Sequence, residues 1–142
     1  MPTREESLSS LKDLDGIRVA VDDPVPSPLS RDAIKSAIEA QLRGAKIKVL
    51  GLGDFPTGDP HVRVTISASA PRNDAVAVFV QVDFVQIVFM RRNPQVTFNR
   101  AQTWKADAQV LLVSPSQVTA AIVREISRQV DQFITDYRAA NA

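Results

Sequence analysis

Residues 75–113, AVAVFVQVDFVQIVFMRRNPQVTFNRAQTWKADAQVLLV, carry the pattern that decides the fold. Two long runs alternate with the period of two that is typical of strands, and a polar segment with a proline separates them. The pattern predicts an antiparallel hairpin with strands from Ala75 to about Arg91 and from about Thr97 to Val113. Facing residues of such a pair have numbers that add to a constant, and a shift of one residue moves every side chain to the opposite face.

A register in which the paired numbers add to 188 gives this hairpin one wholly apolar face. Phe84 then faces Trp104, and the other face sets Asp83 opposite Lys105, a charge pair worth roughly a few tenths of a kcal/mol. A sum of 187 would place Asp83 against Trp104. We therefore predict the sum of 188 along the whole hairpin, which also pairs Val82 with Ala106, Val80 with Ala108, Val78 with Val110, Val76 with Leu112 and Gln81 with Asp107.

Two amphipathic helices are predicted, one before the hairpin in the sequence and one after it. Ser30 is a suitable N-cap for a helix whose apolar residues recur every four positions, and Gly44 is a candidate for its left-handed C-cap. Ser114-Pro115-Ser116-Gln117 has the pattern of a capping box ahead of a longer helix. The apolar residues of the first helix are Ile34, Ile38 and Leu42.

Shorter strands are predicted over 17–21, 47–49 and 61–70, and Gly51–Pro60 has the composition of a loop. The order is strand, helix, four strands, helix. We predict an α+β fold, with a mostly antiparallel five-stranded sheet and both helices on one face. The 142 residues suffice for one domain. We assign residues 1–13 to a polar N-terminal segment and residues 14–142 to the domain.

Composition excludes several classes of function. The formal net charge is +1, so no overall field favours nucleic acid. The chain has no cysteine and a single histidine, which removes thiolate chemistry and multi-histidine metal centres. We therefore predict no cofactor, no nucleic-acid partner and no catalytic residues, and an enzyme is the less expected class.

No apolar run reaches the length of about 18 residues that a membrane-spanning helix needs. Residues 1–16, MPTREESLSSLKDLDG, lack the apolar region of a signal peptide. A chain that starts after a cleaved signal peptide would begin in the same way. We therefore expect a periplasmic or cell-envelope location if a signal peptide has been removed, and a cytoplasmic one otherwise.

The predicted loop before residue 61 holds a cluster of residue types suited to metal binding or to acid–base chemistry. These residues are Asp54, Asp59 and His61. The same loop is rich in ordinary turn formers, which explains its aspartates and glycines equally well. The cluster is therefore a weak candidate for a metal or hydrolase site.

The end of the first hairpin strand is apolar on both faces. Helices can cover one face, so the other needs cover from the chain itself or from a partner. Two arginines follow directly, in the position of charged gatekeepers. The predicted partner-binding residues are Val85, Ile87, Phe89, Met90, Arg91 and Arg92.

Four further segments are GIRVAVDD (16–23), QLRGAKIKVL (41–50), Thr103-Trp104 and VDQFITDYRAAN (130–141). Together they resemble a family of small, uncharacterised bacterial proteins that are commonly exported. The resemblance extends over most of the chain from Gly16 onward, with Lys46 where the family would have a glycine. It implies an α+β fold and an exported protein, and it implies no activity and no catalytic residue.

Three functions follow from these observations. The first is a non-enzymatic binding module that associates with a protein partner or with itself through the hairpin. The second is a carrier of a small ligand or lipid, with a pocket between the C-terminal helix and the sheet. The third is a weak hydrolase or metal site in the segment 51–61.

Overall fold

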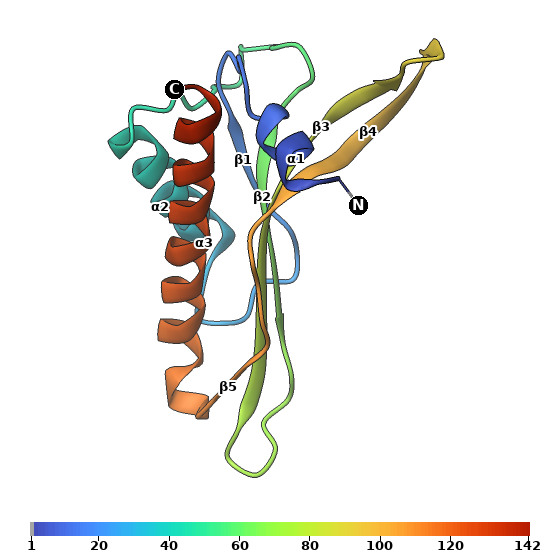
Figure 1. Ribbon diagram of the computed structural model, residues 1–142. Coiled ribbons are helices and arrows are strands. Elements are labelled where there is room, and N and C mark those ends of the chain that lie inside the picture. The colour runs from blue at the N-terminus through green and yellow to red at the C-terminus, as the bar shows by residue number, and fades with distance from the viewer. Residues whose placement is uncertain (1) are drawn as a thin grey trace.

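The computed structural model describes residues 2–142 and has the predicted α+β architecture (Figure 1). Five strands form one sheet in the order β1-β2-β3-β4, and β5 also pairs with β3. β1 and β2 are parallel, and the other pairs are antiparallel. The fold class is confirmed. The elements are α1 (Arg4–Ser9), β1 (Arg18–Val21), α2 (Arg31–Gly44), β2 (His61–Ala68), β3 (Val76–Met90), β4 (Asn93–Lys105), β5 (Leu111–Val113), the 3-10 turn η1 (Pro115–Gln117) and α3 (Val118–Ala140).

The two long helices lie side by side on one face of the sheet (Figure 1). α2 buries the three apolar residues that its period predicts, and the Ser30 hydroxyl accepts a hydrogen bond from the Ala33 N–H at 3.1 Å. α3 runs along β3, where the Phe133 ring stacks on Phe84 with centroids 5.6 Å apart. Burial of these apolar stripes against the sheet is the main force that holds the layers together.

Three local predictions about segment ends are wrong. Gly44 lies inside α2, and the left-handed position falls on Lys46 (φ 64°), because the buried Ile47 closes the helix with an N–H bond to the Leu42 carbonyl. The Ser114 hydroxyl caps no amide, since η1 precedes α3. The segment 47–49 contributes one bridge, from Val49 to Ile17, in place of a strand.

The predicted hairpin register holds at its centre and fails at both ends. Phe84 pairs with Trp104 and Asp83 with Lys105, as the sum of 188 requires. Trp104 therefore lies on the helix-covered face with Val78 and Val80, and all three are buried. At the start of β3, the register with β5 differs by one residue from the predicted one. Val76 pairs with Val113, Ala77 with Leu112 and Val78 with Leu111.

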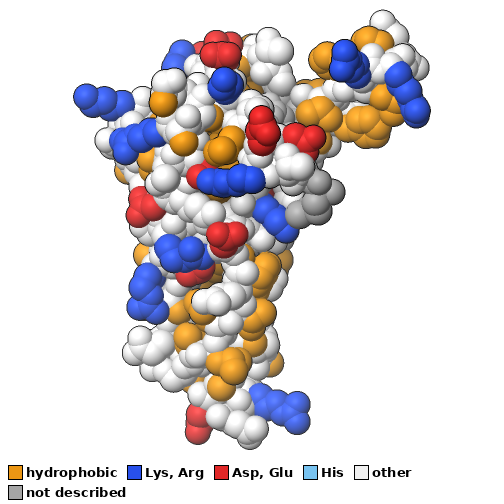
Figure 2. Space-filling model, viewed as in Figure 1, with side chains coloured by type: hydrophobic (Ala, Val, Ile, Leu, Met, Phe, Trp, Pro, Cys, Tyr) orange, Lys and Arg blue, Asp and Glu red, His pale blue; other side chains and the backbone are white. Residues whose placement is uncertain are grey.

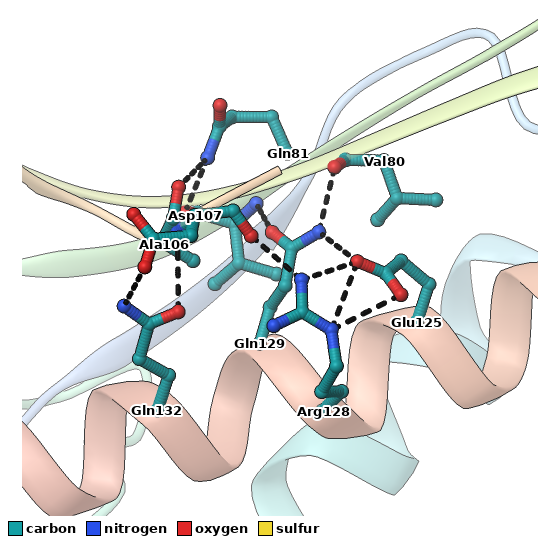
Figure 3. A network of polar contacts seen from close by, with 9 residues as sticks. Val80, Gln81, Ala106, Asp107, Glu125, Arg128, Gln129 and Gln132 are labelled. Carbon is teal, nitrogen blue, oxygen red and sulfur yellow. Dashed lines mark hydrogen bonds and ion pairs between the residues drawn. The ribbon is translucent and has the colours of Figure 1, made fainter. Parts of the chain in front are cut away.

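The register shifts because the predicted second strand is broken at residues 106–110, between β4 and β5. Over this gap the side chain of Gln129 takes the place of the missing strand (Figure 3). Its Oε1 accepts from the Val82 N–H at 2.7 Å, and its Nε2 donates to the Val80 carbonyl at 2.7 Å. Gln129 is fully buried. A buried strand edge needs such partners, so the amide satisfies two groups that the predicted pairing of Val82 with Ala106 and of Val80 with Ala108 would have served.

The break also changes the predicted polar pairs. Lys105 stands opposite Asp83 in the ladder, but the carboxylate of Asp83 pairs with Arg63 of β2, at 2.5 Å. Gln81 donates to the backbone carbonyls of Val82 and Ala106 and makes no bond to Asp107. Val110 and Leu112, the predicted partners of Val78 and Val76 at the start of β3, are 62% and 76% exposed.

Candidate protein-interaction surface

The β3–β4 hairpin projects from the body of the molecule as an arm, which we define as residues 86–101 (Figure 1). Apolar side chains along it lie open to solvent, and Figure 2 shows them gathered on the projection with basic groups among them. Ile87 is 42% exposed, Phe89 64%, Val96 37% and Phe98 49%. Exposed apolar residues that cluster in this way mark interaction sites more often than singly scattered ones do.

Irregular pairing accompanies the projection of the arm. The β3–β4 register shifts between Phe84 and Val85, between Gln86 and Val88, and between Phe89 and Met90. Arg100 on the facing strand has φ 55°, in the left-handed region. Bulges bend a hairpin and increase its twist, so the strands leave the plane of the sheet beyond Val85. The helices therefore cover neither face of the arm.

The root of the arm is fixed to the body by loop and N-terminal contacts. The Ile87 N–H donates to the Gly58 carbonyl at 2.7 Å. Gln86 Nε2 donates to Thr103 Oγ1 at 3.0 Å and to the Ser10 carbonyl at 3.3 Å. Val85 is 2% exposed. The arm therefore begins as an ordered extension of the core, and its tip has no such support.

The arm carries an excess of positive charge. Arg91, Arg92 and Arg100 are exposed, and the segment from Phe84 to Ala106 contains these three arginines, Lys105 and no Asp or Glu. None of the ion pairs among residues 2–142 includes any of these four cations. The arm is therefore both apolar and cationic, and its cations form no ion pair within the described chain.

The predicted partner-binding residues divide into three groups. Ile87, Phe89, Arg91 and Arg92 lie exposed on the arm, and Met90 is half-buried. Val85, also a predicted partner-binding residue, is buried at the root of the arm, where a partner cannot reach its side chain, and this part of the prediction is corrected. The sequence prediction does not include Val96, which falls in the loop expected between the two strands, or Phe98, which falls in the second strand with no binding role.

The segment 51–61 holds its polar side chains in local bonds. Asp54 Oδ2 accepts from the Gly51 N–H at 2.7 Å, and Asp59 Oδ1 accepts from Arg18 Nε at 3.2 Å. His61 Nδ1 lies 2.7 Å from the Asp59 carbonyl. Residues 2–142 contain no group of three His, Cys, Asp or Glu side chains placed to hold a metal ion. The bonds observed in this segment shape a loop.

The same loop exposes two large apolar side chains that the sequence reading did not single out. Leu52 is 96% exposed and Phe55 89% exposed. Gly58 of this loop bonds the arm at Ile87, so both features occur at the same end of the sheet. The signal was available in GLGDFPTG, where apolar residues stand between turn formers with no alternation that could bury them.

The N-terminal helix is fixed to α3 beside the root of the arm. Arg4 donates two hydrogen bonds to the Asp136 carboxylate, at 2.6 and 2.7 Å, and the Trp104 indole N–H donates to the same group at 2.8 Å. Trp104 and Asp136, which come from two of the segments that carry the family resemblance, thus meet in one contact. Leu11 is fully buried in the core.

These bonds set the charge state of Asp136. Burial by itself raises its pKa, but the hydrogen bonds from Arg4 and Trp104 outweigh it and hold the pKa below the ordinary value. The pKa of Glu125 is also lowered, by its hydrogen bonds from Arg128 and Gln129. Both carboxylates are therefore stabilised in the charged form by folding.

Stability should consequently decrease in acid. A carboxylate whose folded pKa lies below its unfolded pKa, about 3.9 for Asp, contributes stability that is present above the unfolded pKa and is lost as pH falls through the folded pKa. We expect the unfolding free energy from urea titrations to decline below about pH 5. Asp136→Asn and Arg4→Ala should each make that decline shallower, and an unchanged slope in both would contradict the role of this contact.

The space between α3 and the sheet is filled. Ile122, Gln129, Val130 and Phe133 point into it and are fully buried. An apolar hollow of about 260 Å³ lies instead between α2 and α3, lined by residues such as Ile34, Ala37 and Ile126. A further hollow of about 600 Å³ lies at the start of α3, between that end of the helix, the sheet and the proline-rich loop that precedes α2, and is lined by residues such as Val25, Ile66 and Val118. The predicted carrier pocket stays a prediction.

No protein-family model matches the sequence, and no curated protein matches it either. Solved structures from bacteria have a similar arrangement of elements. A minor lipoprotein from Acinetobacter baumannii is 12% identical with a TM-score of 0.40, over 84% of this chain and 93% of that one. A hypothetical protein from Chlamydia trachomatis is 10% identical with a TM-score of 0.48, over 89% of this chain and 99% of that one. None of the helices among residues 2–142 is long and apolar enough to cross a bilayer.

Proposed function

We propose that the chain is a non-enzymatic binding module that holds a protein partner with its arm. The observation that carries the proposal is the exposure of Ile87, Phe89, Val96 and Phe98 on a projection whose root is ordered. Burial of such side chains by a partner is favourable by about 25 cal/mol per Å² of apolar surface. The helices cannot supply that burial, because they lie on the body.

The nature of the arm favours a protein over a lipid bilayer as the surface it contacts. Its outermost residues are Arg91, Arg92, Asn93 and Pro94, while the apolar residues lie behind them on both strands. Insertion into lipid would bury the charged end deepest, which is costly. A protein groove can contact the apolar sides and pair the arginines at the same time.

Site-specific photo-crosslinking in the cells that make the protein tests this proposal. A benzophenone amino acid replaces Phe89 or Phe98 on the arm, and Val123 of α3, 50% exposed, provides the matched control on the body. We expect both arm positions to give the same discrete adduct on irradiation and the control position to give none. Absence of an adduct at the arm, or the same adduct at position 123, would contradict the proposal.

A further inference from the structure

We propose that the partner of the arm is a second copy of this chain, bound so that the tip of each arm lies against the root of the other; this rests on the proposed function. Positive and negative charges are unevenly distributed along the chain. The segment Phe84–Ala106 has four basic and no acidic residues, which leaves 13 basic and 16 acidic residues in the remainder. The segment Phe84–Ala106 is thus +4 and the rest of the molecule −3, within a total of +1.

This separation favours one geometry of association over another. Two arms placed tip to tip would bring Arg91 and Arg92 of both copies together with no acidic residue in either segment. A tip placed against the root of the other arm meets α1, which packs beside β4 and carries Glu5 and Glu6 in its first turn. Figure 2 shows acidic groups where the arm joins the body. Opposite charges across an interface fix its orientation and exclude the like-charged alternative.

Twofold symmetry makes the tip-to-root contact occur twice. In a symmetric pair, whatever the tip of one copy touches on the other is touched in return. The strand of the arm from Gln86 to Arg92 extends about 23 Å at 3.3 Å per residue, so two antiparallel arms can lie side by side along most of their length. β4 ends the strand order of the sheet, so its outer edge offers backbone groups for such pairing.

The side-by-side arrangement also covers apolar residues of the outer strand of the arm. Val96 and Phe98 lie two residues apart on β4, whereas Phe89 pairs with Thr97 and therefore lies on the opposite face of the arm from Phe98. Antiparallel pairing of two copies through β4 would bring Val96 and Phe98 of both copies together around the symmetry axis, where cross-strand apolar pairs stabilise a sheet. The arginines at each tip then project past this apolar centre towards the acidic root.

Sedimentation velocity of the purified chain over a concentration series tests the inference. We expect a reversible dimer that weakens as salt is raised towards about 1 M. The double variant Arg91→Glu/Arg92→Glu should weaken the dimer at least about tenfold. Glu5→Lys alone should weaken it less, and Glu5→Lys added to the tip variant should restore part of the loss. Glu6 is left unchanged because its side chain accepts from the Thr3 N–H and caps α1.

A matched control separates the effect of where the charge is changed from the effect of the net charge. Arg72→Glu/Arg124→Glu changes the charge by the same amount at two exposed sites off the arm, and it should leave the dimer intact. All of the substituted side chains are exposed, and a thermal melt of each variant verifies its fold. A monomeric wild type, an equal effect of the control, or no recovery with Glu5→Lys would each overturn the inference. An arm adduct of a mass other than twice the chain would overturn it while the proposed function stands, and no adduct would remove both.

Discussion

Trp104→Ala should destabilise the protein by about 3–5 kcal/mol, the range for truncation of a large buried aromatic residue. Trp104 is 2% exposed, and its ring meets Phe133 edge-on with centroids 5.2 Å apart. The substitution also removes the N–H bond to Asp136, which leaves a buried carboxylate with Arg4 as its remaining side-chain donor. Since a domain is stable by about 5–15 kcal/mol, the loss is a large fraction of the total.

Urea unfolding followed by circular dichroism measures this loss. Trp104→Phe serves as the control because it retains an aromatic ring and removes the indole donor, and we expect it to cost about 1–3 kcal/mol. If the alanine variant were destabilised by less than about 1 kcal/mol, the side chain would not hold the layers together as described.

Gln129→Leu should cost about 2–4 kcal/mol even though it puts an apolar residue of similar size into the core. The substitution leaves the Val80 carbonyl and the Val82 N–H without their side-chain partner, and each unpaired buried group costs about 1–3 kcal/mol. By the ordinary reckoning of apolar burial alone, the same change would be neutral or favourable. The sign of the effect therefore decides between the two accounts.

The matched control is Gln132→Leu, one turn further along α3. Gln132 is half-buried and bonds Asp107 at the edge of the same network (Figure 3), so its loss should cost under about 1 kcal/mol. Amide exchange gives a second readout, since the Val82 N–H should exchange faster in Gln129→Leu. A stabilised Gln129→Leu variant with unchanged exchange at Val82 would show that the amide does not replace a strand.

Periodicity in the sequence predicts the layers of this fold well, because burial on one face enforces it. The pairing of Phe84 with Trp104 was predicted because the alternative register sets the charged Asp83 opposite Trp104. The structure confirms this pairing. The break at 106–110 was not predictable in this way, since ADAQV alternates like the strand before it. The cause lies in Gln129, which is distant in sequence and reads as a polar interruption of an apolar helix stripe.

The candidate site was predicted in part for a related reason. Two apolar faces on one strand show that cover is needed, so Ile87 and Phe89 could be identified from the sequence. Whether the chain itself supplies the cover depends on bulges and on the path of loops, which removed Val85 from the surface and added Phe98. A loop has no period against which exposure can be judged, so Leu52 and Phe55 could be recognised only from the turn formers on either side of them.

Photo-crosslinking at positions 89 and 98, compared with position 123, addresses the binding role of the arm most directly. We expect one shared adduct from both arm positions and no adduct from the helix position. Cross-linking that is as strong from α3 as from the hairpin, or that is missing from the hairpin altogether, would contradict it.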